Sequence, residues 1–203
     1  MSPNNPTNAE HPTGAGSGAD ADPWRDVAES LARMSRELLV QETPRQALDR
    51  VVAYACELID GCEHAGILLL HRGRRVETTA ATSDLVRESD RLQEELAEGP
   101  CFDAVAQKEP VYRVADFNQR VLSWPRYAPK ARELGIASMI GFQLYDAEDI
   151  AAALDVYSTR PRAFTEHSAH VGWLLSSHTA LAVAATRPQD QRHPALRPED
   201  ATG

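Results

Sequence analysis

The three cysteines are the residues of this chain with the most reactive side chains. Cys101 follows Gly99-Pro100, a pair that ends one helix and opens another, so its thiol is expected at a helix N-terminus. There the helix dipole and free N–H groups stabilise a thiolate and can lower the thiol pKa. The functional interpretation is a redox-sensing or ligand-contacting thiol. We favour the alternative, a small buried group packed under a loop, because free cysteine is among the most buried residue types.

Cys56 and Cys62 belong to a predicted helix and to its exit. Cys56 lies on the apolar face of that helix and is expected in the core, whereas the sequence identifies no partner for Cys62. Neither can be placed beside Cys101. Three cysteines without a recognisable spacing favour reduced thiols over a disulfide framework, so a cytoplasmic location is expected.

Histidines on the last predicted helix have a spacing that some metal sites use. His167 and His170 are three residues apart and share a side of the helix, and His178 lies further along. No third and fourth ligand of suitable spacing accompanies them. We therefore interpret this side as a solvated helix face and expect no metal site.

Asp155 interrupts an apolar strand that is expected to be covered on both faces. A buried carboxylate must be hydrogen-bonded or neutralised, so it contacts either a ligand or nearby protein groups, and protein partners are the more common case. Whether Asp155 shares a face with Gln143 or with Phe142 depends on the hairpin register. A one-residue slip swaps the faces, and the sequence leaves that register open.

The connection from Leu92 to Gly135 is predicted to form a binding lid. Loops of this length inside a domain are usually functional or disordered, and its large apolar side chains argue against disorder. The aromatic rings of the lid either line a pocket or fasten the lid to the sheet. Asp116 either caps the loop, which we prefer, or contacts a ligand. The candidate ligand-contacting residues are Cys101, Phe102, Asp116, Phe117, Trp124, Tyr127, Met139, Asp155 and Tyr157.

Several classes of function are not expected. No dinucleotide, P-loop, nucleophile-elbow or zinc-protease motif occurs in its required context, and the carboxylates form no arguable acid–base pair. A net charge of -9 argues against a nucleic-acid surface. No apolar run approaches the length of a membrane span, and the N-terminus lacks a signal-peptide pattern. We expect a non-catalytic protein that uses no cofactor.

The hydrophobic pattern predicts one α/β domain over residues 22–186, between a disordered arm at 1–21 and a disordered tail at 187–203. Helices are expected at 22–40, 44–59, 84–96, from 101, before 135 and at 166–185, and strands at 65–71, 75–82, 111–114, 137–145 and 150–158. Thr43 and Thr165 are predicted helix caps. The expected architecture is a central antiparallel sheet with the N- and C-terminal helices on one face and the helical lid on the other.

This order of elements resembles a GAF domain, a small-molecule sensing fold related to PAS domains. The resemblance covers roughly residues 27–186. The motifs that resemble the GAF half of actinobacterial GAF–ANTAR regulators are Glu98-Gly99-Pro100-Cys101-x-Asp103-Ala104-Val105, Val114-x-Asp116, Trp124-Pro125-Arg126-Tyr127, Ala131-x-x-Leu134-Gly135-Ile136-x-Ser138 and Ala153-Leu154-x-Val156-Tyr157-Ser158. The ANTAR module, a helical RNA-binding antiterminator, is not expected because too few residues follow position 186. Where the last hairpin of that group usually has a glycine and an asparagine, this chain has Ala151 or Ala152 and Asp155.

The resemblance implies a sensory or regulatory domain that binds a small molecule or a signalling protein, in signal transduction or transcriptional regulation. By analogy with GAF domains, the first and last helices are expected to form a homodimer. One alternative is an interaction scaffold whose pocket is filled by its own side chains. Another is a thiol redox sensor or reductase acting through Cys101, although Cys101-Phe102 supplies neither the several cysteines of free methionine sulfoxide reductases nor the Cys-His context of bilin-binding GAF domains.

Overall fold

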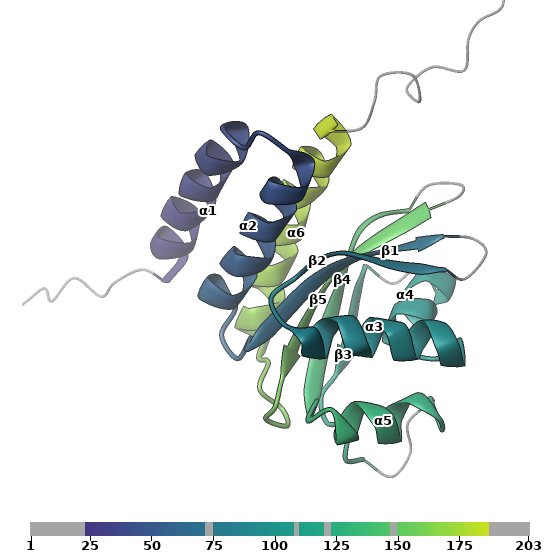
Figure 1. Cartoon of the computed structure of the whole chain (residues 1–203). Coiled ribbons are helices and arrows are strands. Elements are labelled where there is room, and N and C mark those ends of the chain that lie inside the picture. The colour runs from purple at the N-terminus through teal and green to yellow at the C-terminus, as the bar shows by residue number, and fades with distance from the viewer. Residues whose placement is uncertain (1–22, 72–74, 108–109, 120–122, 147–149, 187–203) are drawn as a thin grey trace, which may run out of the picture.

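The computed structural model describes residues 23–71, 75–107, 110–119, 123–146 and 150–186 (Figure 1). The predicted arm and tail and the predicted turns near residues 73 and 148 lie outside these ranges. Every predicted helix and strand is present within a few residues of its expected bounds. The elements are α1 (Pro23–Leu39), α2 (Pro44–Leu58), β1 (His64–His71), β2 (Val76–Ala81), α3 (Asp84–Leu96), α4 (Pro100–Gln107), β3 (Val111–Val114), α5 (Tyr127–Glu133), β4 (Ser138–Asp146), β5 (Ile150–Ser158) and α6 (Glu166–Thr186).

The strands form one antiparallel sheet in the order β2-β1-β5-β4-β3. Helices α1, α2 and α6 gather on one face of this sheet, and α3, α4 and α5 cover the other (Figure 1). Each face has its own apolar core, because side chains along a strand alternate between the two faces. The predicted fold class is confirmed, with terminal helices on one side and the lid on the other.

On the face of the terminal helices, α6 lies close against the sheet. A Cβ on Gly172 would lie 2.1 Å from Cζ of Phe142, so only glycine permits this approach. Val171 and Leu175 are the neighbouring buried positions of α6. Trp173 is 45% exposed, because a residue two positions from Val171 and Leu175 points to the opposite side of a helix.

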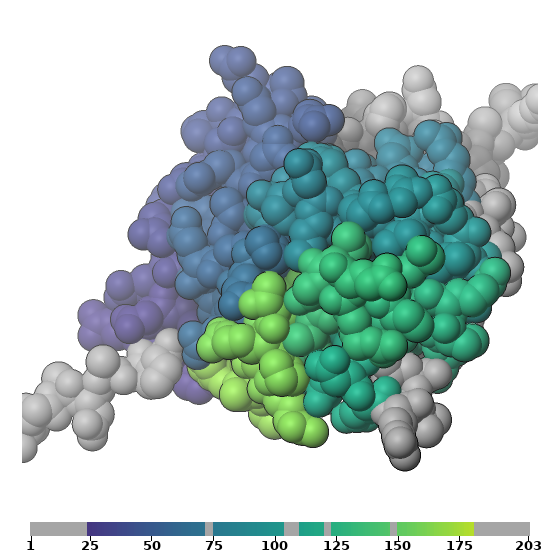
Figure 2. All heavy atoms as spheres, turned by 60° about the horizontal axis from the view of Figure 1, so that its bottom comes forward, coloured from purple at the N-terminus to yellow at the C-terminus, as the bar shows by residue number. Residues whose placement is uncertain are grey.

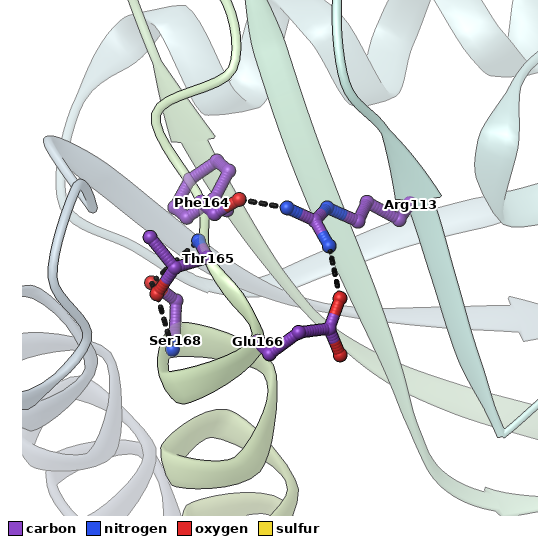
Figure 3. A network of polar contacts seen from close by, with 5 residues as sticks. All are labelled: Arg113, Phe164, Thr165, Glu166 and Ser168. Atoms are coloured by element: carbon purple, nitrogen blue, oxygen red, sulfur yellow. Dashed lines mark hydrogen bonds and ion pairs between the residues drawn. The ribbon is translucent and has the colours of Figure 1, made fainter.

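Side-chain caps fix the starts of α2 and α6. In α2, Thr43 Oγ1 accepts a hydrogen bond from the Gln46 N–H at 3.2 Å, and Gln46 Oε1 accepts one from the Thr43 N–H at 3.0 Å. In α6, Thr165 Oγ1 accepts from the Ser168 N–H at 3.2 Å, and Ser168 Oγ accepts from the Thr165 N–H at 3.0 Å (Figure 3). Both predicted caps are confirmed, and each satisfies helix donors that would otherwise lack a partner.

An arginine joins the edge strand β3 to the start of α6. The guanidinium of Arg113 donates to the Phe164 carbonyl oxygen and forms an ion pair with Glu166 at 2.9 Å (Figure 3). The Glu166 carboxylate is largely exposed, so this pair contributes little to stability by itself. Together with the hydrogen bond to Phe164, the ion pair holds the edge strand β3 next to the start of α6.

Candidate functional site

The register of the β4–β5 ladder places Asp155 on the lid face of the sheet. Asp155 pairs with Gly141 of β4 and with Gly66 of β1, while Phe142 pairs with Leu154 on the opposite face. The Asp155 side chain is only 2% exposed. The question that the sequence left open is therefore settled: Asp155 lies under the lid and not among the terminal helices.

Two glycines make room for this carboxyl group and for the helix above it. A Cβ on Gly141 would lie 2.7 Å from Asp155 Oδ1, which is closer than real Cβ atoms approach. A Cβ on Gly66 would lie 2.3 Å from Cγ1 of Val86 in α3. The strands on either side of Asp155 therefore lack side chains at the two positions where one would collide with the site.

A second buried carboxyl group, Asp90 of α3, lies in the same layer. Its Oδ2 accepts a hydrogen bond from Thr78 Oγ1 at 2.7 Å, and its Oδ1 accepts a long one from the Tyr157 hydroxyl at 3.4 Å. Sequence reasoning missed Asp90 because polar residues on a helix were taken as solvent-facing. The available signal was spacing: the buried residues of α3 include Val86, Ser89, Asp90 and Gln93, which fall on one helical face.

Cys101 lies between the lid and Asp155. Its Sγ donates to Asp155 Oδ2 at 3.1 Å, and its backbone N–H donates to Gln93 Oε1 at 3.0 Å. Burial raises the thiol pKa well above its usual value, and the nearby carboxyls Asp155 and Asp90 raise it further. The lowering expected from a helix N-terminus is outweighed, so Cys101 serves as a protonated hydrogen-bond donor.

Burial also raises the pKa values of both carboxyl groups. Desolvation raises the pKa of Asp155 to about 7, although the hydrogen bond from Cys101 acts in the opposite direction. Desolvation and then the neighbouring Asp155 raise the pKa of Asp90 to about 8, and the hydrogen bond from Thr78 and the charge of Arg87 only partly offset this. Both carboxyls therefore change protonation close to neutral pH, unlike surface carboxylates.

An unpaired amide lies beside this cluster. Gln93 is fully buried; its Oε1 is used by Cys101, but its Nε2 has no hydrogen-bond partner within the described residues. A Cβ on Gly99 would lie 2.3 Å from Gln93 Oε1, so glycine is required there for the amide to reach Cys101. A buried donor without a partner is uncommon and costs free energy, so Gln93 Nε2 is a candidate ligand-binding group.

The aromatic residues of the lid pack mainly on one another. Trp124 lies 6.4 Å, ring centre to ring centre, from both Phe117 and Tyr127, and its Nε1 donates to Asp103 of α4 at 3.0 Å. The Tyr127 hydroxyl is 2.8 Å from Ser89 Oγ of α3. These contacts join α3, α4 and α5 to one another in one layer.

The turn between α3 and α4 also holds α5. The Glu98 carboxylate accepts hydrogen bonds from the backbone N–H groups of Arg126 and Tyr127 at 2.9 and 3.2 Å, and it pairs with the Arg126 guanidinium at 2.6 Å. Ala97 adopts a left-handed conformation, which turns the chain sharply at the end of α3. In Figure 2 the teal atoms of α3 and the green atoms of α5 lie edge to edge across the lid face.

The cavity beneath the lid is very small. It measures about 10 Å³, close to the minimum for one water molecule. Its lining residues are Pro100, Cys101, Gly141, Phe142, Gln143, Ala152, Ala153 and Asp155. The closed structure therefore has no room for a metabolite, and opening would require the lid to move.

Only two of the nine predicted site residues, Cys101 and Asp155, line this cavity. Five of the others, Phe117, Trp124, Tyr127, Met139 and Tyr157, are buried in the apolar core under the lid, and Phe102 packs half-buried against that core. Asp116 lies apart: it accepts a hydrogen bond from the Asn118 N–H at 2.8 Å and pairs with Arg162 at 3.5 Å. Asp116 caps its loop, as preferred.

The histidines of α6 lie away from this cluster. The rings of His167 and His170 are 5.0 and 6.3 Å from the Trp24 ring of α1, and His178 Nδ1 is 2.8 Å from the Leu174 carbonyl oxygen. Within the described ranges, no three His, Cys, Asp or Glu side chains are grouped to hold a metal ion. Over the same part of the chain, no helix has the length and apolar character needed to cross a bilayer.

A family model described as "GAF domain" matches residues 41–184, and no curated protein matches the chain. The fold is similar to the chromophore-binding domain of the bacteriophytochrome RpBphP3 from R. palustris, with a TM-score of 0.64 and 10% identity over 86% of this chain and 64% of that chain. It is similar to the GAF domain of a phosphoenolpyruvate-protein phosphotransferase from Coxiella burnetii (TM-score 0.60, 16% identity, 82% and 98% covered). It is also similar to the phycoerythrobilin-bound GAF domain of a cyanobacterial phytochrome (TM-score 0.61, 13% identity, 82% and 98% covered).

Proposed function

Because the chain belongs to the GAF domain family, we propose that it is a non-catalytic regulatory module whose lid and sheet enclose a small polar ligand. The observation that carries this proposal is the pair of buried carboxyls, Asp90 and Asp155, beside the unpaired Gln93 amide. Such groups are costly in a core that only needs to pack. They are useful in a pocket that must recognise hydrogen-bonding groups.

The chemistry of the pocket favours a ligand that carries N–H donors. Asp90 and Asp155 have pKa values near 8 and 7, so an amine, amidine or protonated heterocycle would find a carboxylate at low energetic cost. The Gln93 amide adds a donor for a carbonyl or ring nitrogen on the same molecule. The expected ligand therefore presents hydrogen-bond donors together with an acceptor.

Binding requires displacement of α4, because the closed cavity holds about 10 Å³. Among the described residues, the hydrogen bonds that α4 must release are Cys101 Sγ to Asp155, the Cys101 N–H to Gln93, and Trp124 Nε1 to Asp103. A ligand donor on Asp155 would replace the weak thiol donor. The free-energy cost of opening the lid is therefore partly offset by a stronger hydrogen bond to Asp155.

The small cavity also supports a second candidate, an interaction scaffold with a self-filled pocket. In that case Cys101, Asp155 and the lid aromatics are structural, and signalling uses the outer helical surfaces. For either candidate we place the module in signal transduction or transcriptional regulation, supported by the likeness of its lid motifs to the GAF half of actinobacterial GAF–ANTAR regulators.

A thermal-shift screen separates the two candidates. Freshly isolated protein and denatured, refolded protein would be tested against cyclic nucleotides, nucleobases, amino acids and flavins. A ligand at about 100 times its Kd stabilises the folded state by about 2.7 kcal/mol, which raises the unfolding midpoint measurably. A hit supports the sensor. No hit, with an unchanged midpoint after refolding, supports the scaffold.

A further inference from the structure

Cys56 and Cys62 come together at the end of α2, outside the pocket. Their Sγ atoms are 3.6 Å apart, and the Cys62 thiol also lies 3.3 Å from the His64 carbonyl oxygen. The turn between them passes through Gly61, whose φ of +90° is a left-handed conformation. A Cβ on Gly61 would lie 2.5 Å from the Ala163 carbonyl oxygen, so this turn is built for glycine.

The two thiols are not equivalent. The pKa of Cys56 is lowered, chiefly because the Cys62 thiol donates a hydrogen bond to its sulfur, and the Thr82 hydroxyl assists; burial and the Glu57 charge oppose this. The pKa of Cys62 is raised far above its usual value by the same hydrogen bond, by burial and by the Glu63 charge. Cys56 is therefore the more acidic thiol of the pair, and Cys62 is the one that keeps its proton.

We propose that Cys56 and Cys62 form a two-cysteine redox site that a hydroperoxide oxidises to an intramolecular disulfide and that a dithiol reduces again. The two sulfurs must approach by about 1.5 Å to reach a disulfide bond length, which side-chain rotation can provide at a helix end. Both residues are half-buried, whereas Cys101 is 3% exposed beneath the lid. A small peroxide therefore reaches this pair before it reaches Cys101.

Oxidation of the pair takes two steps. The Cys56 thiolate attacks one peroxide oxygen, the O–O bond breaks, and the departing oxygen leaves as water, or as an alcohol from an organic peroxide, with the proton that Cys56 lost. Cys62 then attacks the Cys56 sulfenic acid, the S–O bond breaks, and its oxygen leaves as water with the Cys62 proton. Two thiols lose two electrons in total, and the peroxide gains them.

The new bond would join the end of α2 to the entry of β1. Residues 64–71 of β1 pair with β5, and Gly66 of β1 lies opposite Asp155. Glu63, next to Cys62, already binds the sheet, since its N–H donates to the Tyr157 carbonyl oxygen at 2.9 Å. Oxidation therefore constrains the strand that borders the buried carboxyl cluster, independently of whether any ligand binds there.

Peptide mapping of the full-length protein tests this proposal. Trypsin leaves Cys56 and Cys62 together in the peptide 51–72 and Cys101 in the separate peptide 92–108. After hydrogen peroxide treatment and thiol blocking under denaturing conditions, we expect peptide 51–72 to lose the mass of two hydrogens and to escape blocking. Further cleavage after Glu57 should leave its fragments joined until a dithiol is added.

Cys101 is the internal reference for the rate. We expect peptide 51–72 to be oxidised about tenfold or more faster than the Cys101 thiol is consumed. A Cys62→Ser variant should stop at a Cys56 sulfenic acid that a 1,3-dicarbonyl reagent captures. The proposal is overturned if peptide 51–72 stays reduced, if it gains oxygen without forming the cross-link, or if Cys101 reacts equally fast.

Discussion

Asp155 and Gly141 lie opposite each other across the β4–β5 ladder, and a Cβ on residue 141 would lie 2.7 Å from Asp155 Oδ1. Position 141 therefore requires glycine because a side chain there would collide with the Asp155 carboxyl group, and not because of an unusual backbone conformation. We predict that Gly141→Ala destabilises the domain by about 1–3 kcal/mol, because the core must shift to relieve the contact. Chemical denaturation measures the change.

The same substitution in an Asp155→Ala background serves as its control. Without the carboxyl oxygens, the alanine methyl group at position 141 has no atom to collide with. The loss of stability caused by Gly141→Ala should therefore be well below the loss in the wild type. Equal costs in the two backgrounds would show that residue 141 is glycine for another reason.

The buried carboxyls predict an unusual dependence of stability on pH. Their folded-state pKa values, about 7 for Asp155 and about 8 for Asp90, exceed the ordinary value of 3.8. Between pH 3.8 and the folded-state pKa of each group, the unfolded chain has released a proton that the folded chain still holds. Their contribution to stability is therefore fully present below pH 3.8 and is lost as pH rises toward 7 and 8, by up to about 1.4 kcal/mol per pH unit for each group.

Urea unfolding at a series of pH values from 5 to 8 measures this loss. We expect Asp155→Asn to reduce the negative slope, because the amide cannot ionise. Glu166→Gln alters a largely exposed carboxylate and should leave the slope as in the wild type. An unchanged slope in Asp155→Asn would mean that Asp155 is ionised throughout this range.

The bond from Trp124 Nε1 to Asp103 connects α4 to the segment before α5. Replacing Trp124 with phenylalanine removes the donor, and we predict a loss of about 1 kcal/mol together with faster hydrogen exchange in α4. Trp173→Phe is the matched control, since Trp173 lies exposed on α6. Equal exchange of the α4 amides in both variants would contradict a lid held by this bond.

The outer surface of α1 and α6 carries large apolar side chains. Trp173 of α6 is 45% exposed, and Trp24 of α1 is 44% exposed and contacts His167 of α6. We propose that two copies associate there. Trp173→Glu should then shift sedimentation toward the monomer, while Arg91→Glu on the lid side should not. A wild-type protein that sediments as a monomer at high concentration would contradict this proposal.

The order of elements could be predicted because its signals are local. A few neighbouring residues are enough to recognise the caps at Thr43 and Thr165 and the apolar strand at 150–158. The lid was predicted from its length and its aromatic residues.

The composition of the site could not be predicted in the same way. Asp90 and Gln93 are polar residues on the buried face of α3, so a pattern based on hydrophobicity assigns them to solvent. The face of Asp155 depends on cross-strand register, which no single strand encodes. The approach of Cys62 to Cys56 depends on the backbone turn at Gly61, and the raised pKa of Cys101 depends on two carboxyls distant in sequence.

Recognition of a ligand by Asp155 beneath the lid can be tested by comparing three proteins. The midpoint shift produced by the strongest compound of the screen would be measured for wild type, Asp155→Asn and Asp116→Asn. Asp116 caps its loop away from the cavity and provides the matched control. We predict that the shift survives in Asp116→Asn and is lost or strongly reduced in Asp155→Asn. A shift of equal size in all three proteins would mean that the ligand binds elsewhere and that Asp155 does not recognise it.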